Sequence, residues 1–411
     1  MYIGSRLLPR LTRALLAGLL AGVLAWPAGA ASDVEQLRLG DPARRERTID
    51  VVLDGVTDTR TGELIDTVEL ARRLKDVRVL FVGEEHTNGE FHRVQLRVIE
   101  ALRAAGRKPI IGLEMFPWDP QPALERWSRG ELDERGFLDE SRWYEVWSHH
   151  YGHYRAIFEY ARDQRLKLVG LNAPREVVRT VRSKGFEALP PEARRRFPST
   201  IDLSSAEHRS LVRAYFDDED PLHARMSDEA LEGIYRAQVT WDAAMGWQAG
   251  QALTVPADPS EIVVVLIGAG HVAYDLGAAR QLASGFKGRI ASLIPVTVPK
   301  RISAAYAQFV WGVPRTAQPT LPVLGVSLMG RLGQQPSAVI QVDADSSAAA
   351  AGVRVGDILR ALDGTLIDGT AALQRKVGEY DWGDAARLDI ERAGVRMTLP
   401  VVFRRTPQGV R

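Results

Sequence analysis

Short apolar runs alternate with amphipathic segments through most of the chain. Four runs of six or seven residues are rich in Val, Ile and Leu and predict buried strands, at 77–82, 110–116, 166–171 and 262–267. Apolar side chains recur at helical spacing after the first run, at Phe91, Val94, Val98 and Leu102. Continuous apolar strands separated by helices predict an α/β fold, with a mostly parallel sheet covered by helices on both faces.

The first residues have a different pattern. An uncharged apolar stretch at 14–26 follows three arginines and precedes the small residues of 28–30. This is the layout of a secretory signal peptide, and the stretch is short for a membrane-spanning helix, which needs about 20 residues. We therefore predict a signal peptide at 1–30 and a periplasmic mature protein, which would be membrane-associated if the signal is not cleaved.

A segment rich in Pro and Gly at 312–322 predicts a linker. It divides a large domain, 40–311, from a small C-terminal domain, 323–405. Both lie within ordinary domain sizes. The charged segment 183–230 carries several prolines and predicts a helical insertion in the large domain.

The composition excludes several classes of function. The 411 residues contain 53 Lys and Arg against 52 Asp and Glu, a net charge of +1, which becomes −2 when the three arginines of the signal peptide are removed. A nucleic-acid-binding protein would normally be clearly basic, so we expect no nucleic-acid partner. Cysteine is absent, which excludes disulfides, thiolate zinc sites, iron–sulfur clusters and lipids attached through cysteine.

Polar residues follow or end the predicted strands, at Glu85, His86, Glu114, Asn172 and His271. The carboxyl ends of parallel strands meet at one edge of a sheet, where ligands bind in open α/β folds. Imidazole and carboxylate groups are ligands of catalytic divalent metals and of iron. The residues alone therefore predict a shared site, with His86, His271, Glu114 and Glu85 as candidate metal ligands. Two further candidates, Gln238 and Asp242, share a face of a predicted helix and could point into this site.

Five segments, taken in order, resemble the ChaN-type haem-binding uptake domain of the Tiki/TraB/erythromycin-esterase-like superfamily. They are GEEHTNGEFHRVQ (83–95), GLEMF (112–116), GLNAP (170–174), AQVTWDAAM (237–245) and GAGHVAYDLG (268–277). The resemblance covers about 51–298. It departs from the family pattern where Phe91 precedes a single His92 in place of paired histidines.

The resemblance implies two alternative functions. ChaN-type members bind haem in iron acquisition, with tyrosine ligation and haems stacked between subunits, which makes a homodimer an open alternative here. Tyr274 is the first candidate ligand and Tyr154 the second, with His86, His271 and Asn172 also near the cofactor. Tiki-type members instead imply a metal-dependent hydrolase, in which His86, His271, Glu114 and Glu85 would hold a divalent ion.

The C-terminal domain resembles a bacterial periplasmic PDZ domain, a mainly β fold with two helices. The resemblance rests on the LGV segment at 324–326 and on AVIQVDADSSAAAAGVRVGDILRALDG (338–364). It implies that the backbone N–H groups of Leu324, Gly325 and Val326 hold the terminal carboxylate of a partner peptide, which would add as a strand.

Overall fold

The computed structural model describes residues 34–119, 121–147, 149–215, 227–254, 258–315, 320–331 and 334–405. The signal peptide predicted at 1–30 lies outside these ranges. The described chain divides into two compact units: the larger contains 34–142 and 153–315, and the smaller contains 143–152 and 320–405. No helix in the described ranges is long and apolar enough to cross a membrane.

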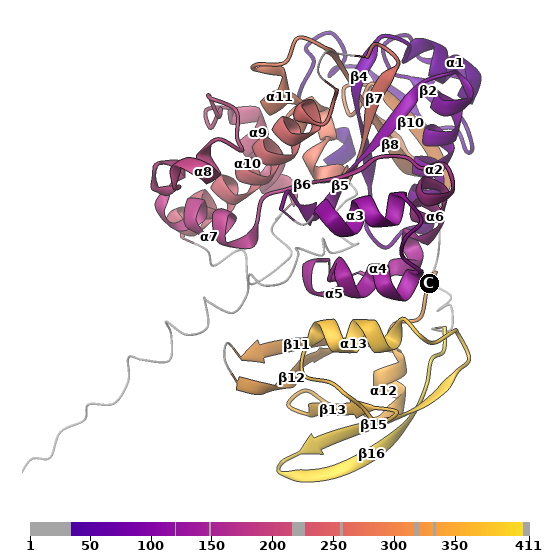
Figure 1. Ribbon diagram of the computed structural model, residues 1–411, viewed down its shortest axis with the longest axis vertical. Coiled ribbons are helices and arrows are strands. Elements are labelled where there is room, and N and C mark those ends of the chain that lie inside the picture. Colours follow the sequence, from indigo (N-terminus) through magenta and orange to yellow (C-terminus); the bar gives the residue numbers. More distant parts are fainter. Residues whose placement is uncertain are drawn as a thin grey trace, which may run out of the picture. The chain divides into compact units, whose positions relative to one another are not determined.

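The larger unit is built on an eight-stranded sheet in the order β3-β2-β10-β8-β4-β7-β5-β6 (Figure 1). The six strands from β10 to β6 run parallel, and β2 and β3 add antiparallel at one edge. The strands are β2 (Val56–Asp58), β3 (Glu63–Ile65), β4 (Val77–Glu84), β5 (Lys108–Pro117), β6 (Leu168–Asn172), β7 (Glu261–Gly268), β8 (Arg289–Val298) and β10 (Phe309–Pro314). A separate antiparallel pair consists of β1 (Thr48–Asp50) and β9 (Arg301–Ser303).

All four predicted strands are present, as β4, β5, β6 and β7. The central strand β7 explains why the pattern is continuous: each residue from Ile262 to Ile267 is fully buried, since helices cover both faces of the sheet there. The linker prediction needs correction at its start, because Gly312, Val313 and Pro314 form the end of β10 and pair with β8.

The crossovers place helices on both faces. Helix α2 (Gly89–Ala104) connects β4 to β5, and its first turn is capped by the Asn88 side chain, which accepts from Glu90 N. Helices α10 (Asp228–Gln251) and α11 (Ala278–Ala283) lie in the crossovers from β6 to β7 and from β7 to β8, which run in the opposite direction along the sheet. Because parallel crossovers are right-handed, α2 covers one face while α10 and α11 cover the other (Figure 1).

The other helices of the larger unit are α1 (Thr67–Arg73), α3 (Gln121–Ser128), α4 (Glu134–Glu140), α6 (Arg155–Asp163), α7 (Arg175–Lys184), α8 (Pro191–Arg194) and α9 (Ala206–Tyr215). Short 3-10 turns occur at Val34–Gln36, Phe186–Ala188, Ala269–His271 and Ala273–Asp275. The insertion predicted at 183–230 contains α8 and α9, which a non-helical segment at 195–205 separates.

The smaller unit contains a six-stranded sheet in the order β11-β12-β13-β15-β16, with β14 paired to β13. Two helices accompany its strands, as predicted for this region, and α5 (Trp143–Val146) belongs to the same unit. The elements are β11 (Val326–Arg331), β12 (Gln334–Val342), α12 (Ser347–Ala351), β13 (Ile358–Leu362), β14 (Thr365–Leu366), α13 (Thr370–Val377), β15 (Ala385–Arg392) and β16 (Val395–Val402). Its core includes the fully buried Leu359, Leu388, Ile390 and Phe403.

Candidate functional site

The crossover directions change between the neighbouring strands β4 and β7. The chain leaves β4 towards one face of the sheet, through α2, and leaves β7 towards the other, through α11. Such a switch point opens a crevice outside the carboxyl ends of the strands. His86 follows β4 and His271 follows β7, so the sheet topology brings the two predicted histidines to the same edge of the sheet.

A buried carboxylate holds His86. Glu84, the last residue of β4, is 3% exposed and its Oε1 lies 2.8 Å from His86 Nδ1. The same carboxylate accepts hydrogen bonds from Tyr154 OH at 2.5 Å and from Gln95 Nε2 at 2.7 Å. His92 completes the surroundings, since its Nδ1 lies 3.5 Å from Glu84 Oε2. Four side chains therefore fix the orientation of Glu84, and Glu84 fixes the ring of His86.

These contacts determine the charge of the pair. Burial favours the neutral acid, but His92, His86 and Tyr154 outweigh it and lower the pKa of Glu84 to about 2. Burial opposes a charge on His86 too, yet the carboxylates of Glu84 and Glu114 raise its pKa above the usual value. The pair is therefore an ion pair in mildly acidic solution.

A second buried carboxylate holds His271 in the same way. Asp242 on α10 is fully buried, and its Oδ1 lies 2.7 Å from His271 Nδ1. The Gln238 side-chain amide, one helical turn earlier, lies 2.8 Å from the same nitrogen. Burial opposes protonation, but Asp242 and Glu114 raise the pKa of His271 to about 10. The pKa of Asp242 changes in the opposite direction. Burial would raise it, but His271 and His208 outweigh burial and lower it.

Glu114 lies between the two histidines. Its Oε1 is 3.4 Å from His271 Nε2, and its Oε2 accepts a hydrogen bond from the backbone of Gly268. Gly268 has no side chain at this point, and a Cβ there would lie 3.1 Å from His86 Cε1 and 3.5 Å from Glu114 Oε2. The glycine therefore leaves room for both groups to meet at the end of β7.

A family of known proteins matches the larger unit. A family model described as haem-binding uptake, Tiki superfamily, ChaN matches residues 70–282, which is more than half of the chain. The chain belongs to the ChaN haem-binding uptake family. The match contains β4, β5, β6 and β7 and every residue of the strand-end site. A second model, of the PDZ domain, matches residues 322–402.

One solved structure shows the same fold as the larger unit. ChaN of Campylobacter jejuni, which binds heme cofacially, covers 62% of this chain and 95% of its own, with 16% identity and a TM-score of 0.52. A serine endoprotease from Yersinia pestis covers 21% of this chain and 29% of its own, with 21% identity and a TM-score of 0.19. None of the curated proteins matches the chain.

The structure places two further predicted site residues of the ChaN unit. Glu85, predicted as a metal ligand, is exposed and its Oε2 accepts from Asn88 Nδ2 at 3.1 Å. Its neighbour Glu84 takes the place in the site. Asn172, predicted near the cofactor, bridges two strand ends: its Nδ2 donates to Glu114 O at 2.9 Å, and its Oδ1 accepts from Ala173 N at 2.8 Å.

The two tyrosines predicted as haem ligands are buried. Tyr274 is 2% exposed and its hydroxyl donates to Val34 O at 2.7 Å. Burial, more than any neighbour, raises its pKa far above the usual value. Tyr154 is fully buried and donates to Glu84. Ligation of iron by either tyrosine would require these hydroxyl groups to leave their present acceptors.

A divalent metal receives no support from the geometry. Within the described ranges, no group of three or more His, Asp or Glu side chains is arranged to hold a metal ion. Glu114 instead faces His271 as an ion-pair partner. The arrangement of these side chains therefore does not support the metal-dependent hydrolase.

Sequence reasoning missed several residues that complete the ChaN site, namely Glu84, Gln95 and His208. One sequence signal could have identified Glu84. It lies two residues before His86, and in an extended chain such residues point to the same face of the sheet. The prediction that Gln238 and Asp242 point into the site is confirmed. His208 carries no such signal, since its Nε2 meets Asp242 Oδ2 at 3.3 Å only after α9 and α10 pack.

The peptide-binding prediction falls at the start of β11. Leu324 O accepts from Ala348 N, and Gly325 O accepts from Asp343 N. In a planar trans peptide the N–H points opposite to the carbonyl, so the N–H groups of Gly325 and Val326 are directed away from these bonded neighbours. Gly325 has φ of 79°, which a residue with a side chain rarely adopts.

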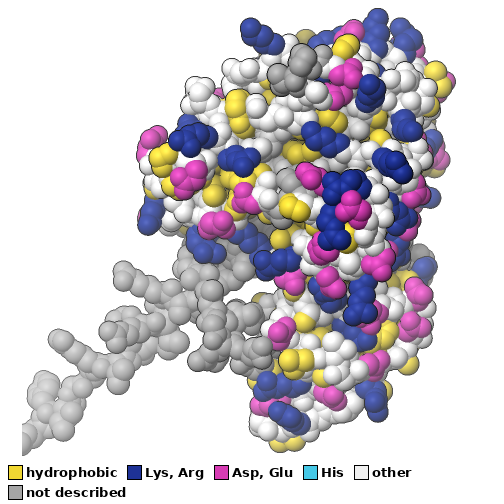
Figure 2. Space-filling model, viewed as in Figure 1, with side chains coloured by type: hydrophobic (Ala, Val, Ile, Leu, Met, Phe, Trp, Pro, Cys, Tyr) yellow, Lys and Arg dark blue, Asp and Glu magenta, His cyan; other side chains and the backbone are white. Residues whose placement is uncertain are grey.

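Charges on the surface are mixed. Figure 2 shows Lys and Arg side chains interspersed with Asp and Glu side chains over the visible face. This distribution accompanies the almost equal numbers of basic and acidic residues in the sequence.

Proposed function

We propose that the ChaN unit binds haem at the carboxyl ends of β4 and β7, with His86 and His271 next to the cofactor. The observation that supports this most directly is the pair of imidazoles at the switch point, each with Nδ1 against a buried carboxylate. Carboxylate contacts of this kind fix the ring and raise the basicity of the other nitrogen, Nε2. Family membership supports haem as the ligand, because the matching model is a haem-binding one.

The residues fit haem better through histidine than through tyrosine. Imidazole is an axial donor to haem iron, and the side chains of His86 and His271 each retain 10% exposure. Tyr274 and Tyr154 are buried and donate to protein acceptors. Bound haem would supply an iron centre that accepts an axial nitrogen ligand, while the chain supplies the orientation of that nitrogen through Glu84 and Asp242.

A role in iron uptake and an exported location complete the proposal. The family description names uptake, and the sequence pattern at 1–30 is that of a secretory signal. ChaN of Campylobacter jejuni binds heme cofacially. A comparable arrangement here would need two haem groups, and a homodimer of this chain is one way to bring them together.

The PDZ domain would recruit a partner through its C-terminal peptide. Strand β11 is the outer strand of its sheet as described, and the Gly325 and Val326 N–H groups lie at its start. These are the requirements for capturing a carboxylate and adding a peptide strand. The partner would thus be brought to a protein that carries haem.

Haemin titration tests the proposal. The mature protein and the variants His86→Ala, His271→Ala and Tyr274→Phe would be titrated while the Soret band is followed and the stoichiometry counted. We expect a saturable shift that is weakened at least tenfold in one or both histidine variants and retained in Tyr274→Phe. Loss of the shift in Tyr274→Phe alone would show that tyrosine ligates the iron. Absence of a saturable shift in the wild type would overturn haem binding itself.

A further inference from the structure

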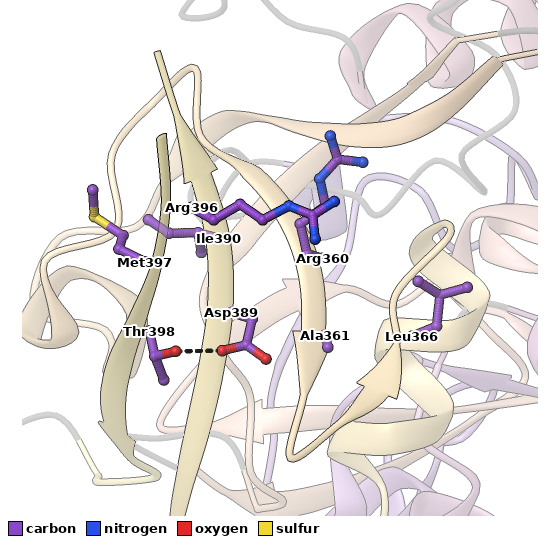
Figure 3. Close-up of a pocket in the computed structure, with 8 residues that line it drawn as sticks. All are labelled: Arg360, Ala361, Leu366, Asp389, Ile390, Arg396, Met397 and Thr398. Atoms are coloured by element: carbon purple, nitrogen blue, oxygen red, sulfur yellow. Dashed lines mark hydrogen bonds between the residues drawn. The ribbon is translucent and has the colours of Figure 1, made fainter. Parts of the chain in front are cut away.

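The PDZ sheet carries a pocket apart from the segment predicted to hold a peptide carboxylate. A pocket of about 420 Å³ lies over β13, β14, β15 and β16 (Figure 3). It is lined by Arg360, Ala361, Leu366, Asp389, Ile390, Arg396, Met397 and Thr398. Its volume is within the range of small-molecule sites.

A β-bulge places the first arginine. The pairing of β13 with β15 shifts register between Leu359 and Ala361, so Arg360 is the extra residue. Bulges redirect side chains out of the regular alternation of a strand. Arg360 Nη2 donates to Glu391 Oε2 at 2.6 Å, whereas its buried Nε has no hydrogen-bond partner among the described residues. A guanidinium with an unused buried donor favours an additional acceptor.

The second arginine increases the positive charge at the same end. Arg396 lies opposite Glu391 in the β15–β16 ladder and is exposed. Figure 3 shows its side chain extending across β15 towards the guanidinium of Arg360. Within the described part of the chain Arg396 has no ion pair, so Glu391 alone offsets two guanidinium groups. The remaining carboxylate of the pocket, Asp389, lies farther along β15.

The other side chains give the pocket a polar part and an apolar part. Asp389 lies away from the arginines in Figure 3, and its Oδ1 accepts a hydrogen bond from Thr398 at 2.5 Å. Leu366 on β14 is 62% exposed and forms an apolar wall with Ala361. A ligand would therefore meet cationic donors at one end and apolar carbon along the wall.

We propose that this pocket binds a small amphiphilic anion, with one carboxylate or phosphate head on Arg360 and Arg396 and a short apolar chain against Leu366 and Ala361. Guanidinium groups bind both heads by charge-assisted hydrogen bonds. This site is independent of haem binding and of the peptide-binding prediction, because its residues belong to neither.

Calorimetric titration of the full chain tests the site. The probes are sodium decanoate and decyl phosphate, each below its micellar concentration, and decanamide as the uncharged analogue. We expect saturable one-to-one binding of an anionic probe, weakened about tenfold in Arg396→Gln, which corresponds to one charge-assisted contact. Comparison of decanoate with decyl phosphate identifies the preferred head.

Arg387→Gln is the matched control. Arg387 lies on β15 and is exposed like Arg396, but it does not line the pocket. Its affinity should stay within twofold of the wild type. The proposal is overturned if neither anionic probe binds saturably, if decanamide binds as tightly as both anions, or if Arg387→Gln weakens binding as much as Arg396→Gln. Arg396→Gln changes an exposed side chain, so the fold should persist, which circular dichroism would verify.

Discussion

Asp242 lies between two histidines, with Oδ1 2.7 Å from His271 Nδ1 and Oδ2 3.3 Å from His208 Nε2. All three groups are buried, at 0% exposure for Asp242 and His208 and 8% for His271. The carboxylate therefore connects α9, α10 and the turn after β7. It also determines the protonation of the histidine that we place beside haem.

Replacement of Asp242 by Asn should lower the pKa of His271 from about 10 towards the ordinary range near 6.5, because the nearest negative charge is removed while burial remains. Nitrogen-15 NMR of the imidazole ring would follow the titration. His208→Gln is the comparison variant, since it leaves the charge of Asp242 in place. An unchanged His271 titration in Asp242→Asn would contradict the ion pair.

Glu84 should control the acid stability of the ChaN unit. Its pKa falls from 4.5 to about 2, so its contribution to stability is present above pH 4.5 and is lost as the pH falls towards 2. A shift of this size corresponds to about 3 kcal/mol. We expect the free energy of unfolding of Glu84→Gln to depend less on pH across this interval.

Urea unfolding at several pH values, monitored by hydrogen exchange of β4 peptides, would measure the pH dependence of the free energy of unfolding. Glu85→Gln is the matched control, because Glu85 is exposed and lies outside the site. Equal pH profiles for Glu84→Gln and the wild type would show that the carboxylate is not held as described.

The sequence predicted the half of the sheet from β4 to β6 but not the half from β3 to β8. Strands β4, β5, β6 and β7 are recognisable because both faces are covered and nearly every residue is apolar. β10 was hidden by Gly312 and Pro314, which ordinarily indicate a linker, and β2 has only three residues. Such short or interrupted strands exist because neighbouring strands pair with them, which a local pattern does not reveal.

The site could be predicted as far as the groups at the strand ends. His86, Glu114 and His271 follow from the rule that ligands bind at the carboxyl edge of a parallel sheet. Glu84 contacts His86, whereas the turn after β4 directs the predicted Glu85 to solvent. Tyr274 was an attractive ligand in the sequence, but its burial depends on Val34, 240 residues away in the chain.

Haem binding through His271 should release a proton. With a pKa of about 10, the ring is protonated at neutral pH, and iron requires an unprotonated nitrogen. If His271 is the axial ligand, haem affinity should rise by up to about tenfold per pH unit between pH 7 and 9. Titrations in buffers of different ionisation enthalpy would count the released proton, and a pH-independent affinity would exclude His271 as the ligand.

Gly268→Ala should disturb the site without unfolding the sheet. The added Cβ would lie 3.1 Å from His86 Cε1, so the imidazole or Glu114 must move by a few tenths of an ångström. We expect haem affinity to fall several-fold and the free energy of unfolding to fall by about 1–3 kcal/mol. Gly285→Ala is the control, because nothing lies within 4 Å of a Cβ there. Equal haem affinities for the two variants would argue against a cofactor beside His86.

Gly325→Ala should impair the PDZ domain and spare haem binding. Gly325 has φ of 79°, and a Cβ there would lie 2.3 Å from Ser346 Cβ, which is closer than such atoms approach in proteins. The start of β11 must therefore shift, and a left-handed backbone with a side chain adds a cost of about 1 kcal/mol or more.

Binding of a peptide with a free C-terminal carboxylate, measured by fluorescence anisotropy, should fall at least tenfold. Gly369→Ala meets no atom within 4 Å and should bind normally. Undiminished peptide binding by Gly325→Ala would mean that the peptide lies elsewhere on the domain, because the Gly325 and Val326 N–H groups could not keep their positions.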